Sequence, residues 1–298
     1  MSDVSTATEE TAAAESTPSK KKRKRPFGFY LAGGWLGLVV FLAVFGSFMP
    51  LPRWDESFYD FLGSPPGTPG HILGTTQDGY DMLAGLVNGA RLSSSIAFVS
   101  VLLGGSIGAF IGISSAYFRG KIDLIVTSIF NVMLSIPNLV LSLALLSVLA
   151  YSDANHPAST LRRVVVLMLS LTIVIVPILG RIARASTLQW AGREFVIASK
   201  SMGTRNFTII RKHILPNVAP AILAIGSVII VEGSLAILGI GIPGGGSWGS
   251  MLANGRSNIQ FSAWEVYMPA LCIAFTVISC NWFGDYVRNL LDKREAKI

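Results

Sequence analysis

The sequence has few charged residues, and it contains only two cysteines and three histidines. Only 14% of its 298 residues are charged, against about 25% in an ordinary soluble domain. Cys272 and Cys280 are separated by about 12 Å along a helix, which is too far for a disulfide. The three histidines are far apart and lack the spacing of metal ligands. The sequence contains no Gly-x-x-x-x-Gly-Lys-Ser/Thr loop, so the usual ATP cradle is missing.

Hydrophobic residues, in contrast, are abundant and gathered in long runs. They make up 51% of the chain. Six apolar runs cover residues 27–49, 92–118, 124–151, 164–180, 218–242 and 266–283. A helix of about 20 apolar residues spans a bilayer, and its backbone satisfies its own hydrogen bonds in lipid. Buried helices of a soluble protein average nearer ~12 residues. We therefore predict an all-α polytopic membrane protein with six transmembrane helices.

The positions of lysine and arginine predict the orientation of these helices. With the N-terminus inside, nineteen of the 24 Lys and Arg residues fall in inner segments, as the positive-inside rule requires. Both termini and the loop 187–217 are then cytoplasmic. The expected organisation is a disordered N-terminal tail with a basic block (1–26), a first transmembrane helix (27–49), an external segment (50–91), a five-helix core (92–291) and a cytoplasmic tail (292–298). We interpret the basic block as a topology signal rather than a nuclear-localisation signal.

The loop between the fourth and fifth runs is basic and amphipathic. Residues 193–216 read REFVIASKSMGTRNFTIIRKHILP. Phe195, Ala198 and Met202 fall on one face of a helix. Gly203 stands where a helix C-terminus favours a residue with positive φ. The pattern predicts two short helices separated by a glycine, which suit a docking surface for another protein.

This loop resembles the cytoplasmic loop of importer-type ABC permeases. Gly203, the nine residues after it, His213, Leu215 and Pro216 keep the spacing of that family. The first triplet of the family pattern, Glu-Ala-Ala, is replaced by residues 197–199, Ile-Ala-Ser, and Glu194 lies nearly one turn earlier. Three further segments are similar to the same family: 73–91, 232–252 and 281–292. Together they resemble the second (C-type) permease subunit of dipeptide/oligopeptide/nickel ABC importers.

The resemblance implies a fold, partners and a mechanism. The chain would form the transmembrane domain of an importer in the cell membrane of a prokaryote, paired with a homologous permease. Two ATPase subunits would carry ATP and magnesium, and an extracytoplasmic binding protein would deliver substrate, most simply di- or oligopeptides. This chain would have no catalytic residue, metal, cofactor or nucleic-acid partner. The implied ATPase-coupling residues are Arg193, Glu194, Phe195, Ile197, Ala198, Lys200, Met202, Gly203, His213, Leu215 and Pro216.

Other segments supply candidates for substrate contact. A polar stripe in the third run, from Ser128 to Ser142, is either hydrogen-bonding contact between helices or one wall of a translocation path. Pro137 lies beside this stripe and predicts a kink in the same helix. Glu232 is an acid inside an apolar run, which suggests a function or a structural hydrogen bond. The path candidates are Asn131, Ser135, Asn138 and Glu232. The candidates that face the binding protein are Trp54, Asp78, Asp81, Trp248 and Arg256.

Three other functions compete with an ABC permease. A stand-alone secondary transporter usually has internal repeats and several ionisable residues within its spans, whereas this sequence offers one such residue, Glu232. A membrane receptor or scaffold needs a larger cytoplasmic domain. An ion channel needs a selectivity filter, and we see no such segment.

In the second run, Gly104, Gly108 and Gly112 predict close helix packing.

Overall fold

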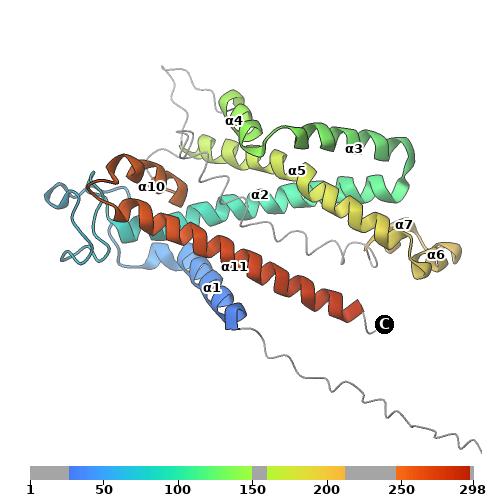
Figure 1. Cartoon of the computed structure of the whole chain (residues 1–298), viewed down its shortest axis with the longest axis horizontal. Coiled ribbons are helices and arrows are strands. Elements are labelled where there is room, and N and C mark those ends of the chain that lie inside the picture. Colours follow the sequence, from blue (N-terminus) through green and yellow to red (C-terminus); the bar gives the residue numbers. More distant parts are fainter. Residues whose placement is uncertain (1–26, 150–159, 212–245, 296–298) are drawn as a thin grey trace, which may run out of the picture.

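The computed structural model describes residues 27–149, 160–211 and 246–295, which form helices and connecting loops (Figure 1). The long helices are α1 (Phe27–Phe45), α2 (Met82–Phe118), α5 (Thr160–Ala191) and α11 (Trp264–Glu295). The shorter ones are α3 (Gly120–Ser135), α4 (Asn138–Leu149), α6 (Glu194–Ser201), α7 (Asn206–Ile209) and α10 (Trp248–Gly255). Over these ranges only isolated β-bridges occur, all within residues 57–81.

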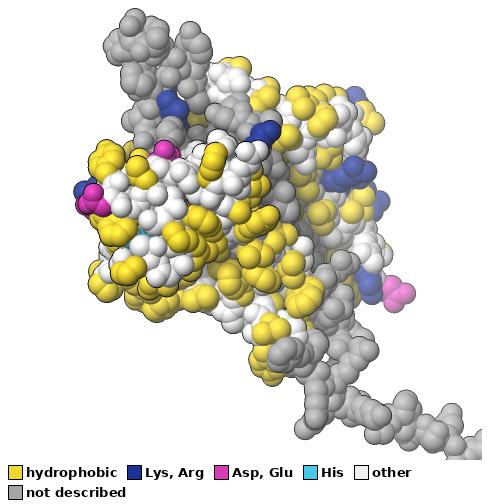
Figure 2. Space-filling model, turned by 60° about the vertical axis from the view of Figure 1, so that its left-hand side comes forward, with side chains coloured by type: hydrophobic (Ala, Val, Ile, Leu, Met, Phe, Trp, Pro, Cys, Tyr) yellow, Lys and Arg dark blue, Asp and Glu magenta, His cyan; other side chains and the backbone are white. Residues whose placement is uncertain are grey.

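Four of the described helices are long and apolar enough to cross a membrane, and a fifth span is possible if the bent pair α3–α4 counts as one. The predicted span 218–242 lies outside the described residues. Many large apolar side chains on these helices are exposed, among them Phe98, Phe110 and Val132. Figure 2 shows hydrophobic side chains spread over the visible face, with few charged ones between them. Such a surface suits lipid or other membrane helices rather than water.

Helices α2 and α5 form the most extensive contact between described elements. The predicted glycine ridge lies in this contact. A Cβ atom at Gly108 would stand 2.5 Å from the carbonyl oxygen of Val176, and one at Gly112 would overlap the carbonyl oxygen of Gly180. Beside the ridge, a core of buried side chains includes Ile96, Val101, Leu167, Leu171 and Ile175. The prediction of close packing at these glycines is therefore confirmed.

The third run is not one kinked helix. Helix α3 ends at Ser135 and α4 begins at Asn138, with a bend of 91° between them. Ile136 adopts extended backbone angles, φ −88° and ψ 128°. A proline disfavours the helical conformation of the residue before it, and its ring displaces the carbonyl of the preceding turn. Pro137 thus ends the helix, and the polar side chains from Ser128 to Ser142 do not share one continuous face.

Several helix ends differ from the expected boundaries. Helix α2 begins at Met82 rather than at residue 92, so the last ten residues of the expected external segment belong to it. Asp81 caps this helix by accepting a hydrogen bond from the Ala84 amide at 2.7 Å, as N-cap residues do. Helix α5 also extends well beyond the apolar run 164–180. Polar residues at helix ends interrupt an apolar run without interrupting the helix.

The two ends of the molecule are built differently (Figure 1). At one end, which we call the α10 end, residues 49–81 and α10 cover the start of α2. At the opposite end, the α6 end, α5 projects and carries α6 and α7. Near this end Arg184 of α5 donates two hydrogen bonds of 2.7 Å to Asp123 of α3. The ion pair fixes α3 to α5 on the way to the short helices.

Candidate functional site

Helices α6 and α7 form the predicted helix–glycine–helix unit at the end of α5. After α5 ends at Ala191, Arg193 occupies the N-cap position of α6 with extended backbone angles. Its guanidinium lies 4.7 Å from the centre of the Trp190 ring, a cation–π contact. Phe195 packs edge-on against the same ring, at 6.3 Å between centroids. Trp190 therefore sets the direction in which α6 leaves α5.

Gly203 provides the turn between the two helices. Its φ is +77°, a conformation that glycine adopts without steric cost. The Gly203 amide donates to the Lys200 carbonyl at 3.0 Å, and the Thr204 amide donates to the Ser199 carbonyl at 3.1 Å. These two bonds make a Schellman motif. The predicted role of Gly203 as helix terminator is confirmed in geometry. Helix α7 begins after Arg205, whose side chain makes no capping hydrogen bond.

Each helix of the unit has one buried apolar residue, and one polar contact joins the unit to α2. Val196 of α6 is 3% exposed and Ile209 of α7 is fully buried. Tyr117, at the end of α2, donates a hydrogen bond of 2.8 Å to Asn206. Tyr117, Trp190 and Ile210 pack against the small buried cluster of α2 and α5 at this end. The unit thus contacts α5 through Trp190 and α2 through Tyr117.

Most other side chains of the unit are exposed, and four of them are large and apolar. These are Phe195, Ile197, Met202 and Phe207, with Met202 76% and Phe207 72% exposed. Arg193, Glu194, Ala198 and Lys200 are also exposed around them. We call these eight residues the α6–α7 face. The expected apolar face of α6 is thus present, whereas His213, Leu215 and Pro216 lie outside the described residues.

The path candidates are divided by the bend at Pro137. Asn131 and Ser135 are exposed on α3, and Asn138 is exposed at the start of α4. Ser142, in contrast, is fully buried. Glu232 lies outside the described residues. The described candidates therefore offer hydrogen-bonding groups on two differently directed helices rather than along one wall.

Two candidates for contact with a binding protein are buried at the α10 end. Trp248 is 2% exposed, lies against Gly89 and donates its indole N–H to the Leu86 carbonyl at 2.9 Å. Asp81 is 3% exposed and caps α2. Neither side chain is available to a protein at this surface, so that assignment was wrong for both. The sequence patterns that singled out these two residues reflect helix packing for Trp248 and helix capping for Asp81.

The other three candidates at this end are accessible. Asp78 and Arg256 are exposed, and Trp54 is half-buried. Sequence reasoning missed Glu265, a 3% exposed acid in the first turn of α11. Its carboxylate accepts hydrogen bonds from the Gln77 amide at 2.7 Å and the Asn258 side chain at 3.3 Å. Glu265 thus joins residues 57–81 to the loop between α10 and α11. A lone acid beside tryptophan gave no signal for this role.

Over residues 27–149, 160–211 and 246–295, no three His, Cys, Asp or Glu side chains are close enough to hold a metal ion. The buried His71 is instead hydrogen-bonded to Asp81 at 2.7 Å and lies between the rings of Phe58 and Phe61. The hydrogen bond and the ring contacts explain why His71 is buried.

Comparison with known proteins identifies the family. Residues 104–297 match the model of the binding-protein-dependent transport system inner membrane component. The chain is 33% identical over 233 residues to the dipeptide transport system permease protein DppC of Alkalihalophilus pseudofirmus, an alignment covering 75% of this chain and 72% of that protein. It is 30% identical over 268 residues to the di/tripeptide transport system permease protein DppC of Pseudomonas aeruginosa, covering 86% and 85%.

A relative with a different named substrate is also similar. The chain is 29% identical over 271 residues to the glutathione transport system permease protein GsiD of Pectobacterium atrosepticum, covering 88% of this chain and 86% of that protein. Both the family match and these alignments include α5, α6 and α7. The chain therefore belongs to the family of binding-protein-dependent transport system inner membrane components and is a membrane permease subunit of an ABC importer.

Proposed function

We propose that this chain is the second (C-type) permease of a di- or oligopeptide importer and that it docks its ATPase through the α6–α7 face. The observation that carries the proposal is the exposure of Phe195, Ile197, Met202 and Phe207 on a unit that Trp190 joins to α5 and Tyr117 joins to α2. Exposed apolar surface costs roughly 25 cal/mol per Å² relative to burial. Apolar side chains that project beyond the membrane spans can fill a complementary groove on a partner protein.

The proposed topology has six transmembrane helices with both termini in the cytoplasm. Its support is the placement of lysine and arginine, which are concentrated in the segments on the α6 side. The α6 end then faces the ATPases and the α10 end faces the binding protein. Asp78 and Arg256, both exposed, are the polar side chains best placed to meet that protein.

The proposed mechanism transmits ATPase movement through helices α2 and α5. Closure of two ATPase subunits displaces the α6–α7 face, and Trp190 and Tyr117 pass this displacement to the ends of α5 and α2. Because α2 and α5 meet along glycines, they move together as one body. A homologous permease completes the pathway, and relative movement of the two permeases exposes it alternately to each side. This chain supplies no catalytic group, and the partner ATPases supply ATP binding and hydrolysis.

The proposed substrates follow from the relatives, two of which are named for dipeptides or tripeptides. Peptide backbones need hydrogen-bond donors and acceptors along their route. Asn131, Ser135 and Asn138 supply such groups at accessible positions, and Glu232 stays a candidate. A path of small amide and hydroxyl groups accepts many side chains, which suits a transporter of varied short peptides.

Capture of the ATPases tests the docking surface. In the co-expressed complex, Met202→Ala/Phe207→Ala should abolish co-purification of the ATPase subunits. The control Phe98→Ala/Phe110→Ala removes two apolar side chains of similar exposure from α2 and should leave co-purification unchanged. Equal capture by both double variants contradicts the docking proposal. Uptake of labelled dialanine by vesicles containing the whole transporter tests the substrate separately.

A further inference from the structure

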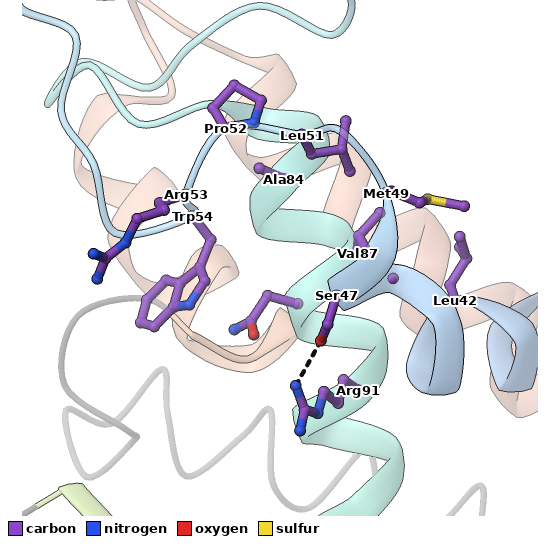
Figure 3. Close-up of a pocket in the computed structure, with 12 residues that line it drawn as sticks. Leu42, Ser47, Met49, Leu51, Pro52, Arg53, Trp54, Ala84, Val87 and Arg91 are labelled. Carbon is purple, nitrogen blue, oxygen red and sulfur yellow. Dashed lines mark hydrogen bonds between the residues drawn. The ribbon is translucent and has the colours of Figure 1, made fainter.

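A pocket of about 190 Å³ lies where α1 ends beside the first half of α2 (Figure 3). Leu42 and Val87 form its apolar side. Ser47, Trp54 and Arg91 surround its polar side, and Figure 3 shows the Arg91 side chain directed toward Ser47. We call it the α1–α2 pocket. It is separate from the α6–α7 face, which lies at the opposite end of α2 (Figure 1).

Arg91 brings a positive charge to this pocket. One of its guanidinium nitrogens donates to the Ser47 hydroxyl at 2.7 Å. Within the part of the chain that the structure describes, no carboxylate forms a salt bridge with Arg91. Arg53, the other cation lining the pocket, is paired with Asp55 at 3.0 Å. The charge of Arg91 is therefore available to an anion, together with the remaining donors of its guanidinium.

The pocket lining changes from apolar to polar along the membrane span that ends at Phe48. Leu42 precedes Ser47 by five residues, which places it about 7 Å deeper along α1. Ser47 and Arg91 meet at the end of the span, and Trp54, which also lines the pocket, follows the span in the sequence. A phospholipid has the same order, from acyl chain through phosphate to headgroup, and tryptophan is enriched at this depth.

We propose that the α1–α2 pocket binds an anionic phospholipid such as phosphatidylglycerol, with its phosphate on Arg91 and Ser47. Guanidinium groups bind phosphate through paired, charge-assisted hydrogen bonds. The Ser47 hydroxyl accepts from Arg91 and has its own hydrogen to donate to a phosphate oxygen. Leu42 and Val87 lie against the upper acyl chains. One N–H of the Asn88 amide, which also lines the pocket, is already donated to the Gly246 carbonyl at 2.8 Å.

The lining distinguishes this ligand from a peptide. A dipeptide carries an ammonium group as well as a carboxylate, and a buried or partly buried ammonium needs an acceptor of negative charge. The twelve lining residues include two arginines and no acidic residue. The pocket therefore matches an anion that lacks a neighbouring cation, which favours phosphatidylglycerol over both a peptide and phosphatidylcholine.

Native mass spectrometry of the delipidated whole complex, titrated with phosphatidylglycerol, tests the proposal. Arg91→Gln should bind one phosphatidylglycerol about tenfold more weakly, as expected for loss of one charged hydrogen-bonding partner. Arg91→Lys keeps the charge and should retain most of the binding, which separates loss of the site from misfolding. Arg181→Gln removes an exposed arginine of α5 outside the pocket and should bind like the wild type.

Three results would each overturn the proposal. In the first, Arg91→Gln binds phosphatidylglycerol as tightly as the wild type. In the second, phosphatidylcholine occupies the site equally well, which would show that the charge of Arg91 is irrelevant. In the third, dialanine displaces the bound lipid, which would make the pocket a peptide carboxylate site. None of these results depends on ATPase capture or on peptide uptake.

Discussion

Tyr117 in the last turn of α2 donates a hydrogen bond of 2.8 Å to Asn206, the first residue of α7. This contact joins the α6–α7 face to a helix that continues without a break to Met82. The opposite end of α2 carries Gly85 and Gly89, against which Met251 and Trp248 of α10 pack. Helix α2 thus contacts both the docking unit and the cap of the α10 end.

We predict that Tyr117→Phe weakens the coupling between ATPase docking and transport. The ring stays and only the hydroxyl is lost, so the complex should assemble normally. A neutral hydrogen bond contributes about 1 kcal/mol, and its loss should lower the ratio of substrate-stimulated to basal ATP hydrolysis about fivefold. Tyr267→Phe, which removes an exposed hydroxyl on α11, is the control. An unchanged ratio in Tyr117→Phe would show that this contact transmits nothing.

A methyl group at the α2–α5 contact should destabilise the bundle. In Gly112→Ala the new Cβ would overlap the Gly180 carbonyl oxygen and lie 3.1 Å from the Arg184 amide nitrogen. Overpacking of this kind costs about 1–3 kcal/mol. We expect a lower thermal unfolding midpoint of the purified complex. Gly37→Ala on α1, where nothing lies within 4 Å of the added methyl group, should leave the midpoint unchanged or raise it.

Replacement of the α2 cap should also lower stability. In Asp81→Ala the Ala84 amide and His71 Nδ1 each lose a partner at 2.7 Å. Loss of an N-cap costs about 0.5–2 kcal/mol, and the unpaired buried imidazole adds to it. Asp78→Ala removes an exposed carboxylate three residues away and should change stability by less than about 0.5 kcal/mol. Equal unfolding midpoints for the two variants would contradict the buried role of Asp81.

Local features of this fold could be predicted from the sequence. Gly203 ends a helix because few residue types adopt the positive φ that this turn requires. All residues of the Schellman motif are close together in the sequence, so the motif can be read from a short segment. The spacing of Gly104, Gly108 and Gly112 predicted a tight contact because helical periodicity places them on one side. In each case the deciding information lies within a few turns of one helix.

Features that depend on distant residues could not be predicted. Trp248 looked like an exposed loop aromatic, but it is buried because Gly89 leaves room for its ring. Glu265 binds the amide of Gln77, a residue far away in the sequence. Pro137 signalled a distortion of the third run, yet a bend of 91° exceeds an ordinary proline kink and depends on what α3 and α4 each pack against. Tertiary contact decided all three outcomes.

Gly203 should be more sensitive to substitution than its neighbour Gly192. At φ +77° any side chain meets the backbone of its own residue, at a cost of about 1–2 kcal/mol. Because nothing lies within 4 Å of an added Cβ at Gly203, the strain is local, and the bundle itself should still fold. The turn is then expected to open and to change the angle between α6 and α7.

We therefore predict that Gly203→Asp inserts in the membrane and assembles with the partner permease, but no longer couples ATP hydrolysis to uptake. Gly192→Asp adds the same charge near the start of α6, where a new Cβ meets only ordinary contacts and no positive φ is required. It should retain most uptake in reconstituted vesicles. If Gly203→Asp shows normal substrate-stimulated hydrolysis and uptake, the turn geometry is not needed for docking. If both variants fail equally, the added charge rather than the backbone conformation is responsible.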